Sequence, residues 1–522
     1  MVRQYPSDQE PSSNPVYATV IHPDWSDNPV LTGDFQLEDV NSWTSISQLP
    51  NCLHQTAQIA LDASVQYIWT PKLCSHDSED SITTAHIFAG GAFNIAAVAC
   101  VEPADPLLPL KELSKMPIVR PQWDLQQALA IRKRETFSKL IHDSRLWEST
   151  LLYQATLLSP ATLYCGKDQL LWQCYHGRAA LCSEALAATG CRCRTVDNQE
   201  GALGQLDLDM FYASAKFGSC ANFDPSPSTS SSDTGSSSPA DFRGFESPQK
   251  CLAAIWTNII ATYSVIGART PEERAAVMAG VAECIPLLAT PGAADFVGSL
   301  SYAHGHWSAD LVEQLTWHVE CNNIENELNL PHRNDTAGRF PTWSWLSIPG
   351  RVIFLFPIST NLGSFLTSLV PEFVFLSPVA KARFATAEEC GAIGVVSTGS
   401  VRACGHLILT KVETPTSELD PFVVHLEGLG KGSVKWDCRD ELDRVTKRSE
   451  ESGGDAYVAW PIYAHHYEDC NTFTARGVLL RRMQNDQGQV FVRCGWFEYK
   501  GEAGGDESQM FDKVPEEEFS II

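Results

Sequence analysis

The sequence lacks the short motifs that identify many common enzymes. It contains no G-x-S-x-G nucleophile elbow, no G-x-x-x-x-G-K-[ST] phosphate loop and no G-x-G-x-x-G dinucleotide fingerprint. An H-E-x-x-H pair and a C-x-x-C pair are also missing, and Cys191-Arg192-Cys193 has no second cysteine pair at zinc-site spacing. The sequence therefore predicts no α/β-hydrolase nucleophile, no metal site and no cofactor.

Basic residues are scarce as well. The chain has 38 Lys and Arg against 63 Asp and Glu, which gives a formal net charge of −25. This balance argues against nucleic acid or an anionic membrane as the main partner. There is no run of about 18 apolar residues, so no membrane span is predicted. Residues 1–16 lack the apolar segment of a secretory signal and are predicted to be a disordered lead-in. We expect a cytoplasmic protein whose partner is another protein.

Cysteine, in contrast, is common. The 17 cysteines are scattered along 522 residues, their number is odd, and no signal segment precedes them. Secreted disulfide frameworks are short and carry an even, regularly spaced set. We therefore expect buried free thiols in a reducing compartment.

Residues 64–100 form the stretch around which the chain is organised. Val65 to Trp69 are strand formers with little alternation, which indicates a strand buried on both faces. Asp77 or Ser78 can cap a following helix, Glu79 and Asp80 lie in its first turn, and Gly90-Gly91 ends it. Phe93 to Cys100 is then predicted to return as a second buried strand.

Such a strand–helix–strand unit is normally parallel, and ligands of parallel sheets bind beyond the carboxyl ends of the strands. Here that position is 70–74. Cys74 is a candidate nucleophile because it follows a strand near a helix start, with a structural thiol as the alternative. Asp77, Glu79 and Asp80 are the candidate acids. His304-Gly305-His306, elsewhere in the chain, is expected to be a turn with exposed or capped imidazoles.

The length allows about three or four domains. Residues 17–21 are β-prone, and Asn51 can cap a helix whose apolar stripe continues to residue 61, so 17–100 follows a β–α–β–α–β order. Residues 157–174 predict a hairpin, 306–320 a helix, and 439–455 a charged exposed loop. A Ser/Pro-rich stretch predicts a disordered linker. The predicted divisions are a lead-in at 1–16, an α/β domain at 17–223, a linker at 224–248, a helical section at 249–345 and a β-rich region at 346–522.

Several segments, in order, resemble the fungal heterokaryon-incompatibility (HET) domain family. Tyr67-Ile68-Trp69-Thr70-Pro71-Lys72-Leu73-Cys74 is similar to the motif Y-x-W-I-D-S-L-C-I. Residues 17–26, with Tyr17 and Trp25, resemble the opening Y-x-x-L-S-[YH]-x-W-G. Residues 153–161 and 171–174 resemble Q-E-R-L-L-S-P-R … W-E-C through Gln154, Trp172 and Cys174. The segments 302–307 and 341–345, the latter with Trp343 and Trp345, are similar to later landmarks of long HET proteins.

The resemblance implies an α/β N-terminal domain that is TIR-like, with a mixed parallel sheet, followed by a helical section and a β-rich region. Some TIR domains cleave NAD. The polar positions of the motifs are replaced here, because the Asp of W-I-D falls on Pro71, the Glu of Q-E on Ala155 and the Arg of S-P-R on Ala161. The apolar positions of the motifs are retained and the polar ones are lost. This pattern suggests that the chain keeps the family's fold but has only a pseudo-active site.

Three hypotheses follow from the sequence. The preferred one is a divergent HET-domain protein that acts through protein contacts in nonself recognition and programmed cell death, or in a related regulatory role. The second is a TIR-like nucleotide (NAD) hydrolase that uses a carboxylate among residues 77–80. The third is a paralogue recruited to another pathway, such as secondary metabolism.

Overall fold

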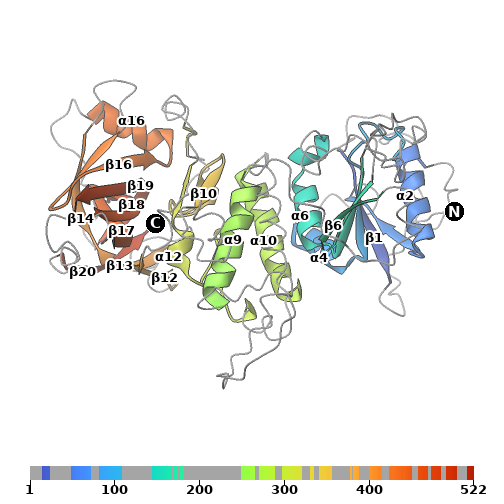
Figure 1. Cartoon of the computed structure of the whole chain (residues 1–522), viewed down its shortest axis with the longest axis horizontal. Helices are drawn as coiled ribbons and strands as arrows, with labels where there is room; N and C mark the ends of the chain where they lie inside the picture. The colour runs from blue at the N-terminus through green and yellow to red at the C-terminus, as the bar shows by residue number, and fades with distance from the viewer. Residues whose placement is uncertain are drawn as a thin grey trace, which may run out of the picture. The chain divides into compact units, whose positions relative to one another are not determined.

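The computed structural model separates the chain into two compact units, each described by itself (Figure 1). The N-terminal unit comprises Met1–Lys216, Ile266–Ala268 and Ala279–Leu288, and the C-terminal unit comprises the rest. The structure describes residues 15–23, 49–71, 81–107, 144–166, 170–174, 177–181, 248–264, 270–288, 297–319, 330–333, 340–354, 377–378, 380–386, 399–413, 422–448, 457–467, 472–483, 489–502 and 514–522.

The N-terminal unit is built on a six-stranded sheet in the order β2-β1-β3-β4-β5-β6. Strands β2, β1, β3 and β4 are parallel, and β5 and β6 continue the sheet antiparallel. This sheet bears out an α/β unit with a mixed sheet. The hairpin predicted over 157–174 is present, but it begins at Ala161 because residues 157 and 158 belong to helix α6. The strands are β1 (Tyr17–Ile21), β2 (Tyr67–Trp69), β3 (Phe93–Ala96), β4 (Ala161–Cys165), β5 (Leu170–Cys174) and β6 (Gly177–Leu181).

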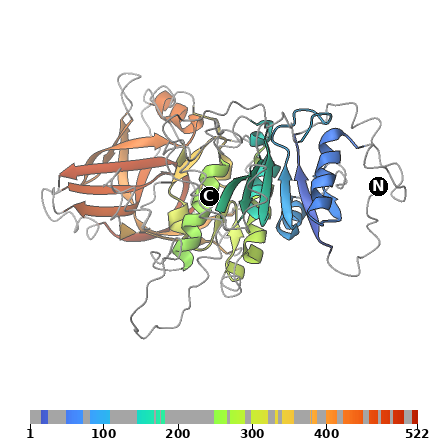
Figure 2. The same cartoon turned by 45° about the vertical axis from the view of Figure 1, so that its right-hand side comes forward.

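Helices cover both faces of this sheet. Helix α2 (Asn51–Asp62) lies on one face, and α4 (Ser81–Gly90) and α6 (Thr150–Leu158) lie together on the other, as Figures 1 and 2 show. A short 3₁₀ turn, η3 (Arg145–Glu148), precedes α6. The α2 face of the sheet carries an apolar cluster because alternate strand residues point to it. Its members include Ala18, Cys52, Ala60, Phe93, Ile95, Leu163 and Cys165.

Three local predictions in this unit were wrong. Strand β2 is an edge strand, so Tyr67 is 39% exposed rather than buried on both faces. Pro50, not Asn51, is the N-cap of α2, and the Asn51 amide donates instead to the carbonyl of Ala104. Strand β3 ends at Ala96 rather than Cys100, because its neighbour β1 ends at Ile21 and the chain then turns.

The C-terminal unit starts with helices and continues into short strand pairs. Helix α9 (Pro248–Tyr263) lies wholly in this unit, whereas α10 (Pro271–Leu288) is divided between the units after Met278. The elements that follow are β7 (Tyr302–Ala303), β8 (His306–Trp307), α12 (Leu311–Gln314), β9 (Trp317–Val319), η4 (Trp345–Ser347) and β10 (Val352–Phe354). The helix predicted at 306–320 is therefore broken into a strand, one helical turn and another strand.

The rest of this unit is the predicted β-rich region, and it closes into a barrel. Strands β14, β17, β18, β19, β16 and β15 pair in turn, and β15 returns to β14. The ring strands are β14 (Ile408–Glu413), β15 (Val423–Leu426), β16 (Gly430–Trp436), β17 (Tyr457–Tyr467), β18 (Thr472–Arg482) and β19 (Val490–Glu502). Further strands extend the sheet: β11 (Ser377–Pro378), β12 (Lys381–Phe384), β13 (Val401–His406) and β20 (Glu516–Ile521).

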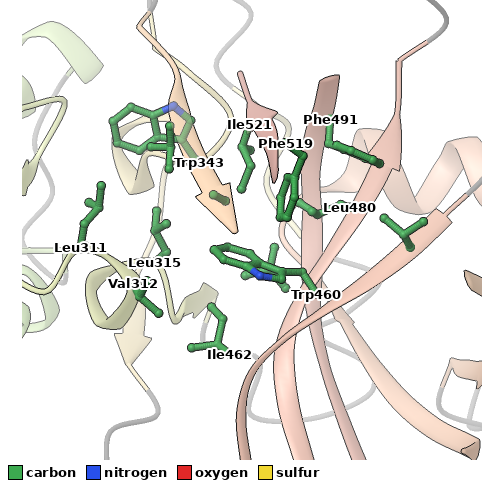
Figure 3. Packing of buried hydrophobic residues seen from close by; sticks show 14 of the residues in the cluster. Leu311, Val312, Leu315, Trp343, Trp460, Ile462, Leu480, Phe491, Phe519 and Ile521 are labelled. Carbon is green, nitrogen blue, oxygen red and sulfur yellow. The ribbon is translucent and has the colours of Figure 1, made fainter. Parts of the chain in front are cut away.

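A large apolar cluster holds this unit together. Helix α12 contributes Leu311 and Val312, and the barrel contributes Trp460, Leu480 and other residues that face them (Figure 3). The loop predicted at 439–455 is wrong over its first part, because Arg439–Arg448 forms helix α16 with Leu442 and Val445 buried. No helix among the described residues is long and apolar enough to cross a membrane.

Candidate functional site

The candidate site is the carboxyl edge of the parallel strands in the N-terminal unit. Strand β2 ends at Trp69, and the next residue, Thr70, is buried with a hydroxyl that has no hydrogen-bond partner among the described residues. Pro71, at the place of the motif's acid, is half-buried. The remaining predicted residues of this edge lie outside the described residues, namely Leu73, Cys74, Asp77, Glu79 and Asp80, as does Trp25.

Two aromatic residues of the motifs fix helix α4 against the sheet. The Tyr17 hydroxyl donates a 2.7 Å hydrogen bond to the carbonyl of Ile87, and the Trp69 ring meets Phe88 edge-on at 5.5 Å. A Cβ atom on Gly90 would lie 2.7 Å from the Tyr17 hydroxyl oxygen, so a larger residue there would displace the Tyr17 ring. Tyr17 and Trp69 therefore position α4 against the sheet.

A row of polar residues crosses the middle of the sheet. Thr19, Asn94 and Thr162 are register partners on adjacent parallel strands, and all three are buried. The Thr19 hydroxyl donates to Asn94 Oδ1 at 3.1 Å, whereas Asn94 Nδ2 has no hydrogen-bond partner among the described residues. Gln154 of α6, also buried, donates to the carbonyl of Ser81 at 3.3 Å and so ties α6 to the start of α4. These groups are neutral.

Three buried thiols meet at the same carboxyl edge, on the α2 face. Cys52 lies in the first turn of α2, Cys100 follows β3 and Cys165 ends β4, and all belong to one cluster. The Cys100 thiol donates to the carbonyl of Pro106 at 3.7 Å, and the N–H of Ala99 donates to the carbonyl of Cys165 at 3.0 Å. Sequence reasoning missed this cluster, because its members come from three distant segments and only Cys74 followed a recognisable motif.

The electrostatics of this edge favour neutral groups. A hydrogen bond with Cys100, and then burial, raise the pKa of the Cys52 thiol far above its usual value, and burial raises that of Cys165. Protonated thiols are poor nucleophiles and poor metal ligands. The carboxylate of nearby Asp105 is engaged by the backbone, since it accepts hydrogen bonds of 2.8 Å from the N–H groups of Val101 and Glu102.

The downstream motif residues assemble around α6, β4 and β5. Ala155 lies in α6 and Ala161 begins β4, and both are buried. Trp172 packs its ring 6.2 Å from Phe93, and Cys174, the last residue of β5, is in register with Ala161. Ala155 and Ala161, at the positions of the motif's Glu and Arg, are therefore buried and uncharged.

In the C-terminal unit, the two later landmarks form one aromatic cluster. The carbonyl of Gly305 accepts hydrogen bonds from Nε1 of Trp256 at 2.8 Å and from Nε1 of Trp345 at 3.2 Å. The Ser344 hydroxyl donates to the carbonyl of His304 at 2.7 Å. Trp256 also packs edge-on against Tyr302 and Trp307, with ring centroids 5.4 and 6.0 Å apart. Segments 302–307 and 341–345 are thus one packed unit, as expected for core tryptophans.

His306 corrects a prediction, because it is fully buried rather than exposed or capped. Its ring lies 5.5 Å from the Trp343 ring, and neither ring nitrogen has a hydrogen-bond partner among the described residues. Burial lowers the pKa of His306 to about 3, and the same cause lowers that of His318, which stacks on Trp496, to about 3. Both imidazoles are neutral in the folded unit, because the charged form would be desolvated.

A buried ion pair lies in the same unit. Arg493 donates from Nε to Asp437 at 2.7 Å and from its terminal nitrogens to the carbonyls of Leu315 and Trp317. Its guanidinium carbon lies 3.7 Å from the centre of the Trp317 ring, and both members of the ion pair are at most 1% exposed. The charge is saturated by partners, so it ties the barrel to β9 rather than awaiting a ligand.

Comparisons with known protein families, with curated proteins and with solved structures find no match for this chain. Within the part of the chain that the structure describes, no group of three or more His, Cys, Asp and Glu side chains is arranged to hold a metal ion.

Proposed function

We propose that this chain is a divergent HET-domain protein that acts by contacts with another protein, in fungal nonself recognition and programmed cell death. The ordered set of motif segments supports the family, and the replacement of its polar positions by Pro71, Ala155 and Ala161 supports a non-enzymatic role. The motif positions that this chain retains are apolar or aromatic, and their side chains pack in the fold.

The observation that carries the proposal is that the titratable groups described at the carboxyl edge are buried or already engaged by the backbone. The residue at the motif's acid is Pro71, the thiols of Cys52 and Cys165 have raised pKa values, and Asp105 is occupied by two backbone N–H groups. General acid–base or nucleophilic catalysis needs a group that changes charge or attacks at neutral pH. The raised pKa values of the thiols and the backbone hydrogen bonds to Asp105 do not suit these groups to such chemistry, and this favours a contact surface.

The proposal is tested by inducible expression in a fungal host with growth as the readout. We expect the wild-type chain to reduce growth, and Trp69→Ala to relieve the effect, because Trp69 positions α4 through Phe88. Leu409→Ala is the matched control, since Leu409 is 58% exposed in the C-terminal unit and its removal leaves the aromatic contact intact. Unaltered growth with all three chains, at equal protein levels, would count against a cell-death effector.

A further inference from the structure

The outer face of the barrel carries a row of basic side chains on four adjacent strands. The strand register pairs Lys411 of β14 with His425 of β15, and His425 with Lys431 of β16. Lys500 of β19 continues the row through the antiparallel register of β16 and β19. Register partners on adjacent strands share a face and lie about 5 Å apart. We call these four residues the basic row.

The basic row is open to solvent. Burial alternates along β14 and β15, and Lys411 is on an exposed position of this pattern. The side chains of Lys431 and Lys500 are 64% and 53% exposed. Like charges on neighbouring strands repel each other, so packing of the barrel does not explain why these cations are grouped. The grouping stands out further because the chain has only 38 basic residues against 63 acidic ones.

The basic row already holds one carboxylate of the chain itself. Glu413 of β14 accepts a hydrogen bond of 3.2 Å from Lys431 Nζ, and the same carboxylate oxygen lies 2.6 Å from His425 Nε2. Two neighbouring members of the row therefore converge on a single carboxylate. This arrangement shows how the row can engage the acidic side chain of another molecule.

The cations of this face exceed the acids that could neutralise them. The other acids described on it are Glu427 and Glu498, and Glu498 already accepts hydrogen bonds from Nε and Nη2 of Arg476. Lys411 and Lys435, on the same face, are exposed and have no acidic partner among the described residues. Positive charge on this face is thus left for an external anion.

We infer that the basic row is a docking site for an extended, acidic segment of a partner protein. Lys411 and Lys431 are two strands apart, about 10 Å, and residues i and i+3 of an extended chain are separated by about the same distance. A segment with a carboxylate at every third residue therefore fits the row. The inference goes beyond the proposed function, because it concerns the C-terminal unit and does not depend on the carboxyl edge of the N-terminal sheet.

A single-stranded nucleic acid fits this face less well. Its phosphates are regularly spaced, so they would meet Glu413 and Glu498 as well as the lysines. Bases also need aromatic side chains to stack on. Among the described residues of the C-terminal unit, the exposed large apolar side chain is Leu409, which offers no such platform.

The test measures binding of a synthetic peptide to the full chain by fluorescence anisotropy. The probe is a fluorescein-labelled peptide of Glu-Ser-Ser repeats, and the same peptide with Gln in place of Glu is its control. We expect the Glu peptide to bind at low salt and to bind more weakly as salt is added, because exposed ion pairs are screened. The Gln peptide should not bind. A photo-crosslinking group on the Glu peptide should label β14, β15 and β16.

Variants of the full chain locate the site. Lys411→Gln and Lys500→Gln together should weaken binding of the Glu peptide about tenfold, since each removes one exposed ion pair. Lys381→Gln is the matched control, because Lys381 is an exposed lysine of β12 outside the basic row, and it should leave the affinity unchanged. Thermal unfolding should be the same for all these chains, since the side chains are exposed.

The inference would be overturned if the Glu peptide did not bind at low salt. Equal weakening by Lys381→Gln and by Lys411→Gln would also overturn it, because binding would then follow the overall charge and not the basic row. A single-stranded thymidine oligonucleotide that binds more tightly than the Glu peptide, and is lost in the double variant, would assign the face to nucleic acid instead.

Discussion

The two units use charge in opposite ways. The N-terminal sheet carries a row of neutral polar residues, Thr19, Asn94 and Thr162, across its middle on one face. On the other face, at the carboxyl edge, burial and hydrogen bonding raise the pKa values of the Cys52 and Cys165 thiols. The C-terminal unit buries ion pairs in and beside its barrel, among them Arg493–Asp437 at 2.7 Å and Arg481–Glu441 at 3.1 Å. The strongest electrostatics therefore lie where the sequence motifs give no site, and they serve the fold.

The largest expected effect is the loss of the Arg493 partner. Asp437→Asn leaves a buried guanidinium without its carboxylate, which should lower the free energy of unfolding of the C-terminal unit by about 3–5 kcal/mol. Urea unfolding followed by tryptophan fluorescence measures this. Glu518→Gln is the control, because its pair with Arg402 is exposed and should contribute about 0–1 kcal/mol. If both variants lowered the free energy of unfolding equally, the buried ion pair would not be more stabilising than the surface ion pair, contrary to the prediction.

Gly305→Ala should cause the next largest loss of stability. Gly305 has φ of +84°, and an added Cβ would lie 2.5 Å from Trp345 Nε1, so both the backbone and the tryptophan cluster would be strained. We expect a loss of about 2 kcal/mol or more. Gly298→Ala is the matched control, since a Cβ there meets nothing within 4 Å and the residue has no positive φ. A Gly305→Ala chain as stable as the control would show that the cluster tolerates rearrangement.

The buried histidines predict a pH dependence confined to the C-terminal unit. The folded pKa values of His306 and His318 are lowered to about 3, below the unfolded value, so the unfolded state binds more protons as the pH falls below about 6.5. Their stabilising contribution is present above that pH and is lost progressively towards pH 3. Between pH 6.5 and 5.5 each should lower stability by up to about 1.4 kcal/mol.

Chemical unfolding at the two pH values, compared between wild type and His318→Gln, measures this term. The variant should show a smaller difference between the two pH values, because one titrating imidazole is gone. The same pH difference in both chains would mean that His318 is not held neutral by burial.

The smallest predicted effects concern two buried hydroxyl groups of the N-terminal sheet. Thr19→Val removes the hydroxyl that donates to Asn94 and should cost about 1 kcal/mol, because a buried acceptor loses its partner. Thr70→Val replaces a buried hydroxyl that has no hydrogen-bond partner among the described residues and should be neutral or slightly stabilising. Thermal unfolding of the two isosteric variants gives their order. A larger loss for Thr70→Val would reveal a polar interaction at the strand end.

A feature of the fold can be predicted from the sequence when a short stretch of neighbouring residues determines it. Strand 17–21, the α2 helix and the helix stop at Gly90-Gly91 follow from short patterns, and the structure confirms them. It also confirms the hairpin within the predicted range 157–174. Strand order does not follow from such patterns, so the sequence predicts burial on both faces for a strand that lies at the sheet edge and exposes Tyr67.

The features of the candidate site and the C-terminal unit that the sequence does not predict also have physical explanations. The thiol cluster depends on contacts between residues 52, 100 and 165, which no local motif encodes. Helix α16 was overlooked because its many charges suggested a loop, although Arg439 and Asp443 form an i,i+4 pair at 2.6 Å and Leu442 and Val445 give it a buried face. The sequence predicts a turn at His304-Gly305-His306, but it does not show the tertiary packing that buries His306.

The central claim is that the carboxyl edge of the N-terminal sheet is a contact surface and not a catalytic centre. The most direct measurement incubates the purified full chain, at high concentration, with NAD and follows nicotinamide release against a protein-free control. The account predicts no release above that control. Sustained release that is lost when Asp77, Glu79 and Asp80 are together changed to their amides would contradict it and would establish a nucleotide hydrolase.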